Sequence, residues 1–268
     1  MRDPRPHADE DAARGVKDSV RHQFSAAAEG YAASWPHADG PDLRALCGAV
    51  AARPGERALD IGCGAGHTTF ALAAAGADVT ALDLTDAMLA QTRAGARERG
   101  LARVRVERGD AEALPFPDAS FDVVVSRLAA HHFPRAAVFA REAARVLRPG
   151  GRFALSDSVA PDDAAEDTWL NAIELLRDPS HVRNHRVGEW RAMLESAGLA
   201  DVRRAGSFPC PLDFDVWTDR MHTPAAAREG LRALFRAAPD GVRRAFALDP
   251  DARSWQLDIA VVAAAKPR

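Results

Sequence analysis

Short apolar runs alternate with amphipathic stretches through the middle of this chain. The runs of strand length lie at 57–61, 79–82, 104–107, 121–126 and 152–156. Between them, apolar residues recur at helical spacing over 67–75, 87–99 and 136–147, and each stretch ends near glycine or proline. The fourth run contains three consecutive valines, which indicates a strand buried on both faces. This alternation predicts a parallel sheet covered by helices on both sides.

The flanking segments are less regular. Residues 1–13 are rich in charge and proline and are expected to fray, whereas residues 16–33 and 43–52 have helical patterns. Beyond residue 157 we expect helices at 164–176 and 187–197, a strand at 202–207, mostly helix over 213–238 and a strand at 255–263. The predicted organisation is an N-terminal helical lid at 1–53 and one α/β domain at 54–268, with substrate-lid insertions around 158–190 and 209–250.

Composition narrows the possible partners. The chain has 268 residues, 47% of them hydrophobic, which is enough for the core of one decorated α/β domain. A formal net charge of −3 provides no positive field that would attract nucleic acid or an anionic membrane. Neither a signal peptide nor an apolar run of about 18 residues is visible. We therefore expect a cytoplasmic monomer or homodimer that binds neither nucleic acid nor membrane.

The three cysteines, Cys47, Cys63 and Cys210, are widely spaced. An odd, sparse set indicates neither a disulfide framework nor a CxxC zinc site. His181 and His185 stand four residues apart, but in a polar, arginine-rich segment, so we expect no metal.

The most informative motif is the glycine loop Gly62-Cys63-Gly64-Ala65-Gly66, which follows the first strand. Glycine lets the backbone approach a ligand closely, and ligands of such sheets bind beyond the carboxyl ends of the strands. The spacing differs from the dinucleotide fingerprint GxGxxG, because His67 replaces its third glycine. Asp83 ends the second strand, where a carboxylate can bind ribose hydroxyls. Asp110 and Ala111 follow the third strand and could bind an adenine edge.

The segment from Leu59 to Ser156 resembles class I S-adenosyl-L-methionine (SAM)-dependent methyltransferases, most of all those resembling the ubiquinone/menaquinone-biosynthesis C-methyltransferases. The glycine loop, the two carboxylates, the run His131-His132-Phe133 and the turn Arg148-Pro149-Gly150-Gly151 carry this resemblance. It implies a Rossmann-like three-layer sandwich with a seven-stranded, mostly parallel sheet, an antiparallel last strand and helical lid segments. It also implies SAM as cofactor and a small-molecule acceptor: a quinone-like, phenolic or other secondary-metabolite carbon or oxygen.

The resemblance assigns roles to individual residues. Gly62 and Gly64 would hold the methionine part of SAM, with Asp60 orienting its amino group and Arg127 beside it, whereas Gly66 either joins them or serves helix packing. Asp83 would bind the ribose, and the residues near the adenine would be Leu84, Met88, Asp110 and Ala111. The family's lid is represented by Phe24 and by Tyr31, the single tyrosine, whose hydroxyl could reach cofactor or acceptor, although a packing role is equally compatible with the sequence.

Methyl transfer depends mainly on positioning and needs a base only if the acceptor must lose a proton. His131 and His132 are the candidates because histidine titrates near neutral pH. The alternative is that one packs and the other hydrogen-bonds the backbone. Candidates for lining the acceptor site come from the variable regions, although their aromatic members could equally cement lid helices: Phe24, Trp169, Ile173, Arg177, Arg183, His185, Phe214, Trp217 and Met221.

Other functions share some of these features. A SAM-binding protein that does not methylate, such as a natural-product cyclase, would keep Asp83 and Asp110. An NAD-dependent oxidoreductase is disfavoured by the glycine spacing. A nucleic-acid or protein amide methyltransferase is disfavoured because the segment 126–130 lacks a Pro-Pro-aromatic loop, and an arsenite methyltransferase would need more cysteines.

Overall fold

The computed structural model describes the backbone of residues 5–32 and 40–268, and the side chains of residues 10–25 and 40–268. The side chain of Tyr31 therefore lies outside the described residues. The elements are α1 (Arg5–Ala32), α3 (Pro41–Val50), β1 (Arg57–Ile61), α4 (His67–Ala74), β2 (Asp78–Asp83), α5 (Asp86–Glu98), β3 (Val104–Arg108), β4 (Phe121–Arg127), η1 (Ala130–His132), α6 (Ala136–Val146), β5 (Leu147–Val159), α7 (Ala164–Arg177), α8 (Val187–Ser196), β6 (Ala200–Asp213), α9 (Phe214–Arg220), α10 (Ala225–Arg236), α11 (Asp240–Ala245) and β7 (Ser254–Ala265).

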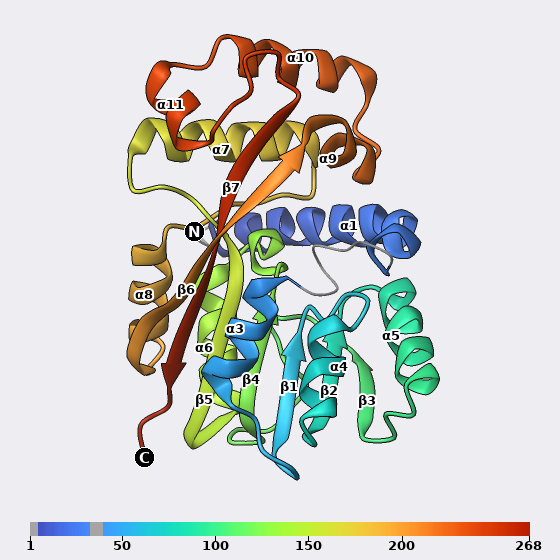
Figure 1. Ribbon diagram of the computed structural model, residues 1–268. Coiled ribbons are helices and arrows are strands. Elements are labelled where there is room, and N and C mark those ends of the chain that lie inside the picture. Colours follow the sequence, from blue (N-terminus) through green and yellow to red (C-terminus); the bar gives the residue numbers. More distant parts are fainter. Residues whose placement is uncertain (1–4, 33–39) are drawn as a thin grey trace.

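The strands form one seven-stranded sheet in the order β3-β2-β1-β4-β5-β7-β6 (Figure 1). The pairs among β1 to β5 are parallel, and β7 runs antiparallel to both of its neighbours, β5 and β6. This confirms the predicted fold class. The strand order reverses between β1 and β4, and in such sheets the crevice beyond the carboxyl ends at that point is the usual ligand site.

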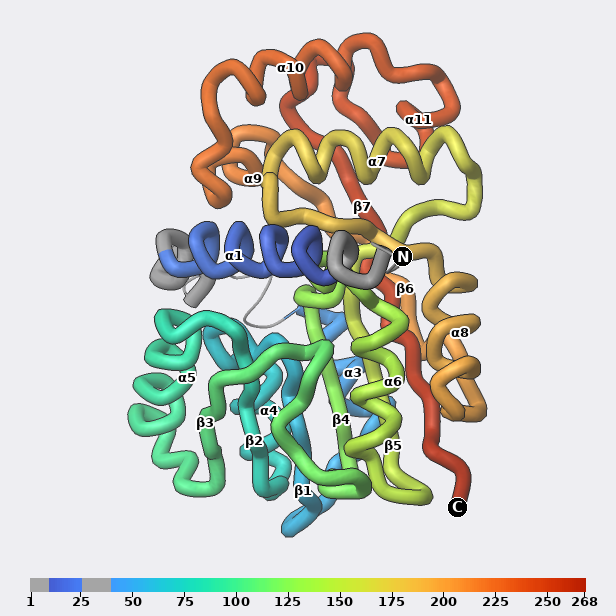
Figure 2. The backbone as a smooth tube through the Cα atoms, turned by 180° about the vertical axis from the view of Figure 1, so that it is seen from behind, coloured from blue at the N-terminus to red at the C-terminus, as the bar shows by residue number. Residues whose placement is uncertain are grey.

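Helices cover both faces because neighbouring strand residues point to opposite sides. In β4, Val123 and Val125 pack with apolar residues of α3 and α4, whereas Val124 packs with those of α6 and α8. Figure 1 shows α3 and α4 in front of the sheet, and Figure 2, seen from behind, shows α6 and α8 in front. Burial on both faces explains the unbroken valine run.

Beyond the carboxyl edge of the sheet, α7, α9, α10, α11 and the extended ends of β6 and β7 form an upper lobe (Figure 1, top). It has a hydrophobic core of its own, in which the ring centroids of Trp217 and Trp255 lie 4.9 Å apart. Trp169 packs 5.2 Å from Phe235, and Ile173 is fully buried in the same core. The structure thus places Trp169 and Ile173 in packing positions, which was the alternative to lining the acceptor site.

The helix α1 lies between the sandwich and the upper lobe and packs beside α5 (Figures 1 and 2). It begins at Arg5, so the expectation of a frayed segment up to residue 13 is wrong; alanines favour helix there, and Ala13 is buried. Among the described residues of the predicted lid at 1–53, α1 crosses the crevice, whereas α3 packs against β5, β6 and β7. That α1 acts as a lid stays a prediction.

Two further differences from the predicted elements have simple causes. The strand β6 extends through Pro209 and Pro211, well beyond the expected 202–207. It lies at the sheet edge, where a residue without an N–H need not lose a ladder hydrogen bond. The short helices η1 and α11 were not predicted, because three to six residues hold too few positions for a helical period. No helix among the described residues is long and apolar enough to span a membrane.

Candidate active site

A first cavity lies at the carboxyl ends of the central strands, with Lys17, Val20 and Phe24 of α1 on its wall. It brings together residues from four strand ends that are far apart in the sequence. The members of the expected cofactor set that line it are Gly62, Gly64, Asp83, Leu84, Met88, Asp110, Ala111 and Arg127.

The glycine loop has left-handed backbone at three positions, with φ of 68° at Gly62, 53° at Gly64 and 92° at Gly66. A Cβ on Gly62 would lie 2.7 Å from the Cβ of Ala129, so the loop packs tightly there. A Cβ on Gly64 would meet no atom within 4 Å, so the loop is open at this point. Gly66 does not line the cavity, and a Cβ added to it would lie 2.6 Å from the Phe70 ring. This close packing favours the alternative that Gly66 serves helix packing.

Asp83 is fixed at the cavity wall by two backbone donors. Its Oδ2 accepts from the Gly64 N–H at 3.0 Å, and its Oδ1 accepts from the Thr85 N–H at 2.8 Å. Burial raises the pKa of Asp83, and these hydrogen bonds oppose that rise. A carboxylate oxygen can accept more than one hydrogen bond, so both oxygens can still accept from a ligand.

Asp60 lies under the glycine loop and is not part of the cavity wall. Its Oδ2 accepts from the Thr69 hydroxyl at 2.6 Å, and its Oδ1 has no hydrogen-bond partner among the described residues. Burial raises the pKa of Asp60 to about 6. The structure leaves one buried carboxylate oxygen able to accept from a donor, and the expected contact with an amino group stays a prediction.

Lys17 ties α1 to the opposite wall of the first cavity. Its Nζ donates to Asp110 Oδ2 at 2.7 Å and to Glu112 Oε2 at 2.6 Å. Sequence reasoning missed Lys17 because a single lysine in a charged helix is usually a solvated residue. Its one signal was scarcity, since the chain has only two lysines.

A second cavity of about 310 Å³ lies on the other side of Leu128, which lines both cavities. Its wall is mostly apolar and is built from β6, β7, α7 and α9 together with His131. Between the cavities, Arg127 makes a bidentate ion pair with Asp42, with N–O distances of 2.6 and 3.0 Å. Arg127 lines the first cavity and Asp42 the second. Asp42 was not predicted, because in the sequence it resembles any acidic residue in a first helical turn.

His131 reaches the second cavity with its ring held by Asp157. Its Nδ1 lies 2.6 Å from Asp157 Oδ1, and its backbone N–H donates to Oδ2 at 2.9 Å. Burial opposes protonation of the ring, but the charge and hydrogen bond of Asp157 outweigh it, so the pKa of His131 is raised. Asp157 was missed, although it follows the fifth predicted strand, in the place where functional residues were expected.

His132 faces the first cavity, with its ring edge-on to Phe24 at 4.9 Å between centroids. Its Nδ1 lies 3.0 Å from the Ser180 carbonyl oxygen, so the ring donates there. Burial and then the charge of His131 lower the pKa of His132 to about 4. His132 is therefore neutral near pH 7 and is held by packing and one backbone contact.

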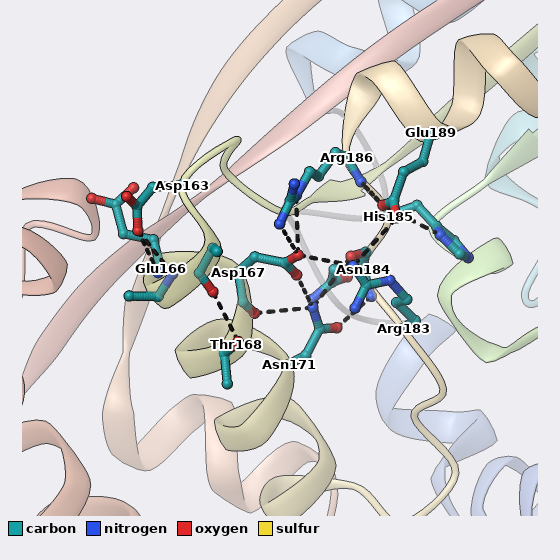
Figure 3. Close-up of polar contacts among 12 residues, drawn as sticks. Asp163, Glu166, Asp167, Thr168, Asn171, Arg183, Asn184, His185, Arg186 and Glu189 are labelled. Atoms are coloured by element: carbon teal, nitrogen blue, oxygen red, sulfur yellow. Dashed lines mark hydrogen bonds and ion pairs between the residues drawn. The ribbon is translucent and has the colours of Figure 1, made fainter.

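A polar network holds the loop at 178–186 against α7 and α8 (Figure 3). Asp167 Oδ2 accepts from Arg183 at 2.8 Å and from Arg186 at 2.6 Å, and its Oδ1 accepts from Asn171 at 2.7 Å. The same loop donates two backbone N–H groups, at 2.9 and 3.1 Å, to the His131 carbonyl oxygen. The network thus helps to fix the position of η1.

The remaining acceptor-site candidates are divided between the cavities and the interior. Arg177 and Trp217 line the second cavity, and Phe24 lines the first. Met221 is buried, and its carbonyl accepts from Gln23 of α1 at 2.7 Å. His185 lines neither cavity; it lies in the network of Figure 3, with Nδ1 3.6 Å from Glu189. Among the described residues no group of three potential metal ligands comes together.

A family model, a curated relative and a solved structure all match this chain, and both the family model and the relative are described as methyltransferases. The family model described as "Methyltransferase domain" matches residues 59–155. The "Uncharacterized methyltransferase YcgJ" of Bacillus subtilis is 39% identical over 227 residues, which cover 84% of this chain and 88% of that protein. The crystal structure of the YcgJ protein superposes with a TM-score of 0.81 at 36% identity, and the match covers 85% of this chain and 98% of that chain.

Two relatives of named activity also match. The "27-O-demethylrifamycin SV methyltransferase" of Amycolatopsis mediterranei is 37% identical over 70% of this chain and 67% of its own length. The "Ubiquinone/menaquinone biosynthesis C-methyltransferase" of Methylobacterium nodulans is 46% identical, over only 36% of this chain and 40% of its own length.

Proposed function

The chain belongs to the class I SAM-dependent methyltransferases, and we propose that it methylates an apolar small molecule at an oxygen or carbon that must first lose a proton. The main support for this proposal is the position of His131. Its Nδ1 lies 2.6 Å from Asp157 Oδ1, and the residue lines an apolar cavity beside the proposed cofactor site. The acceptor would be quinone-like, phenolic or another secondary metabolite. Relatives named for a rifamycin derivative and for ubiquinone/menaquinone biosynthesis support such a substrate class.

SAM is the cofactor of the family, and the donor set of the first cavity fits it. Gly64 leaves the loop open, so a ligand can approach its backbone closely. The carboxylate oxygens of Asp83 can still accept hydrogen bonds from ribose hydroxyls. One oxygen of Asp60 has no hydrogen-bond donor among the described residues. Bound SAM supplies a methyl group activated by a positively charged sulfur. The residues that we propose to hold it are Gly62, Gly64, Asp83, Leu84, Met88, Asp110 and Ala111, with Asp60, Arg127 and Tyr31 at the methionine end.

In this proposal His131 is the general base. Its Nδ1–H donates to Asp157, so Nε2 keeps the free lone pair that can take a proton from the acceptor. Asp157 also accepts from the Ser158 N–H at 2.9 Å and is buried, so it fixes the tautomer and the orientation of the ring. Such a carboxylate–imidazole pair raises the basicity of the imidazole, and general base catalysis contributes typically about 10²–10⁴-fold in rate. His132, neutral and packed against Phe24, has a positioning role.

The test begins with calorimetric titration of S-adenosylhomocysteine, using NAD as the control ligand. Labelled SAM is then supplied with a panel of phenols, hydroquinones and β-dicarbonyl compounds, and labelled product is measured. We expect S-adenosylhomocysteine to bind, NAD not to bind, and at least one acceptor to be methylated. NAD binding, or retention of the label in SAM with every acceptor, would contradict the proposal.

The base is tested with His131→Asn, and with His222→Asn as control because His222 is exposed and its φ of 52° suits asparagine. We expect His131→Asn to lose about 10²-fold or more in kcat while S-adenosylhomocysteine binding is unchanged. The activity of the wild type should rise with pH through the raised pKa of His131, since only the neutral ring accepts a proton. A pH profile in His131→Asn identical to that of the wild type would exclude His131 as the base.

A further inference from the structure

Among the described residues, one charged group of the second cavity lacks the partner that the other charged groups have. Its charged lining residues are Asp42, His131, Glu174, Arg177 and Arg220. Asp42 pairs with Arg127, His131 pairs with Asp157, and Glu174 lies 3.4 Å from Arg177. Arg220 makes no hydrogen bond or ion pair with any part of the chain that the structure describes. The cavity therefore holds one uncompensated cation, and arginine stays protonated at all ordinary pH values.

The surroundings of Arg220 are apolar, which strengthens the effect of its charge. The adjoining wall comes from Phe208, Leu212, Trp217, Leu257 and Ile259. Burial raises the pKa of the nearby Cys210 thiol, and the charge of Arg220 opposes that rise. Arg220 thus acts on groups inside the cavity, where charges interact more strongly than in water.

Arg177 lines the same cavity as Arg220, and its Nε faces Glu174 Oε2 at 3.4 Å. The two arginines occupy the last turns of α7 and α9, and the Thr223 hydroxyl joins these helix ends by donating to the Arg177 carbonyl at 3.0 Å. The Arg177 guanidinium lies 5.1 Å from the Trp217 ring centre, and its buried Nε has no hydrogen bond within the described residues. A helix C-terminus accommodates a cation, but it does not account for two guanidinium groups that line one apolar cavity.

We propose that the acceptor is an apolar carboxylic acid whose carboxylate is bound by Arg220, with Arg177 beside it. This inference rests on the proposed function and adds the substrate class to it. The apolar body of the acid fills the cavity, and the atom to be methylated faces His131. A guanidinium binds a carboxylate through two parallel hydrogen bonds, so the acid supplies the partner that the Arg220 side chain lacks among the described residues.

The experiment compares decanoate with 1-decanol by titration calorimetry, with the first cavity filled by saturating S-adenosylhomocysteine. The two probes share the apolar chain and differ in charge. We expect decanoate to bind the wild type at least about tenfold more tightly than decanol, because hydrogen bonds to charged groups are the strong class. Equal affinities, or no binding of decanoate, would overturn the proposal.

The variant Arg220→Gln removes the charge, and Arg236→Gln is the matched control, because Arg236 is exposed in the last turn of α10 and outside the cavity. Arg220→Gln should reduce decanoate affinity about tenfold and leave decanol affinity unchanged, whereas Arg220→Lys should lie between it and the wild type. Arg236→Gln should match the wild type. An unchanged decanoate affinity in Arg220→Gln would refute the assignment.

The two proposals fail in different ways. If neutral phenols are methylated at equal rates by the wild type and Arg220→Gln, and decanoate shows no preference over decanol, the methyltransferase proposal stands and the acid proposal fails. If decanoate binds through Arg220 but no label leaves SAM with any acceptor, the anion site stands and the proposed reaction fails.

Discussion

The buried histidine His181 makes the stability of this protein depend on pH in a way that one substitution can isolate. His181 is 5% exposed, and its Nε2 lies 3.2 Å from Asn171 Oδ1. Burial, and then repulsion by the nearby arginines and by the protonated forms of His131 and His132, lowers the pKa of His181 to about 2. The folded protein therefore keeps this ring neutral down to strongly acidic pH.

The free energy of unfolding depends on pH because His181 has different pKa values in the folded and unfolded states. The unfolded chain protonates this histidine near its ordinary pKa of about 6.5, and the folded chain does not. The stabilisation is complete above about pH 6.5 and is lost as the pH falls toward the folded pKa. Between about pH 8 and about pH 5 the unfolded state gains nearly one proton here, which removes about 2 kcal/mol from the free energy of unfolding.

The measurement is urea denaturation of the wild type and His181→Gln at both pH values. The glutamine keeps an N–H for Asn171 and cannot titrate. We expect the loss of stability between the two pH values to be smaller by about 2 kcal/mol in the variant. The lowered pKa of His132 adds a loss of the same sign to both proteins, and the raised pKa of His131 acts oppositely in both, so these contributions cancel in the comparison. An identical pH dependence in both proteins would refute the reasoning.

Two further predictions concern the first cavity, and a third concerns the ion pair between the two cavities. Asp83→Asn should weaken S-adenosylhomocysteine binding about tenfold in calorimetry without changing the melting temperature of the free protein, and equal affinity would disprove the proposed ribose contact. Lys17→Met should free α1 from Asp110 and so speed its cleavage by trypsin, whereas an unchanged cleavage rate would show that the ion pair does not hold the helix. Asp42→Ala should destabilise the protein by about 3–5 kcal/mol in urea denaturation, because it leaves Arg127 buried without its partner; a loss below about 1 kcal/mol would contradict this.

The sequence predicts the sandwich well because its signals are local. The strands β1 to β5 are buried runs punctuated by glycine turns, and the expected cofactor residues stand at the ends of these strands. A parallel sheet places all such ends at one edge. Most of the expected cofactor residues, from Gly62 to Arg127, line the first cavity because of that geometry.

The second cavity was harder to predict because its residues share no periodic pattern. Asp42 comes from a helix before the sheet, Glu174 from α7 and Arg220 from α9, and only the fold brings them together. The aromatic residues of the upper lobe show the same difficulty. Trp169 and Trp217 both pack in the core region of the lobe, but only Trp217 of the two also lines the second cavity.

The position of α1 links the two cavities physically. At one point Lys17 binds Asp110 and Glu112 on the cofactor side, and at another Gln23 donates to the Met221 carbonyl, next to Arg220 in the upper lobe. Phe24 of the same helix contacts His132, whose neighbour His131 lines the second cavity. Residues of α1 line the first cavity, and through Gln23 and Phe24 the helix also contacts Met221 and His132, which are sequence neighbours of Arg220 and His131 in the wall of the second cavity, so a rigid movement of α1 would change contacts on both sides. If α1 is the lid that we predict, S-adenosylhomocysteine and decanoate should each bind more tightly in the presence of the other, and titration calorimetry with one ligand at saturating concentration would measure this coupling.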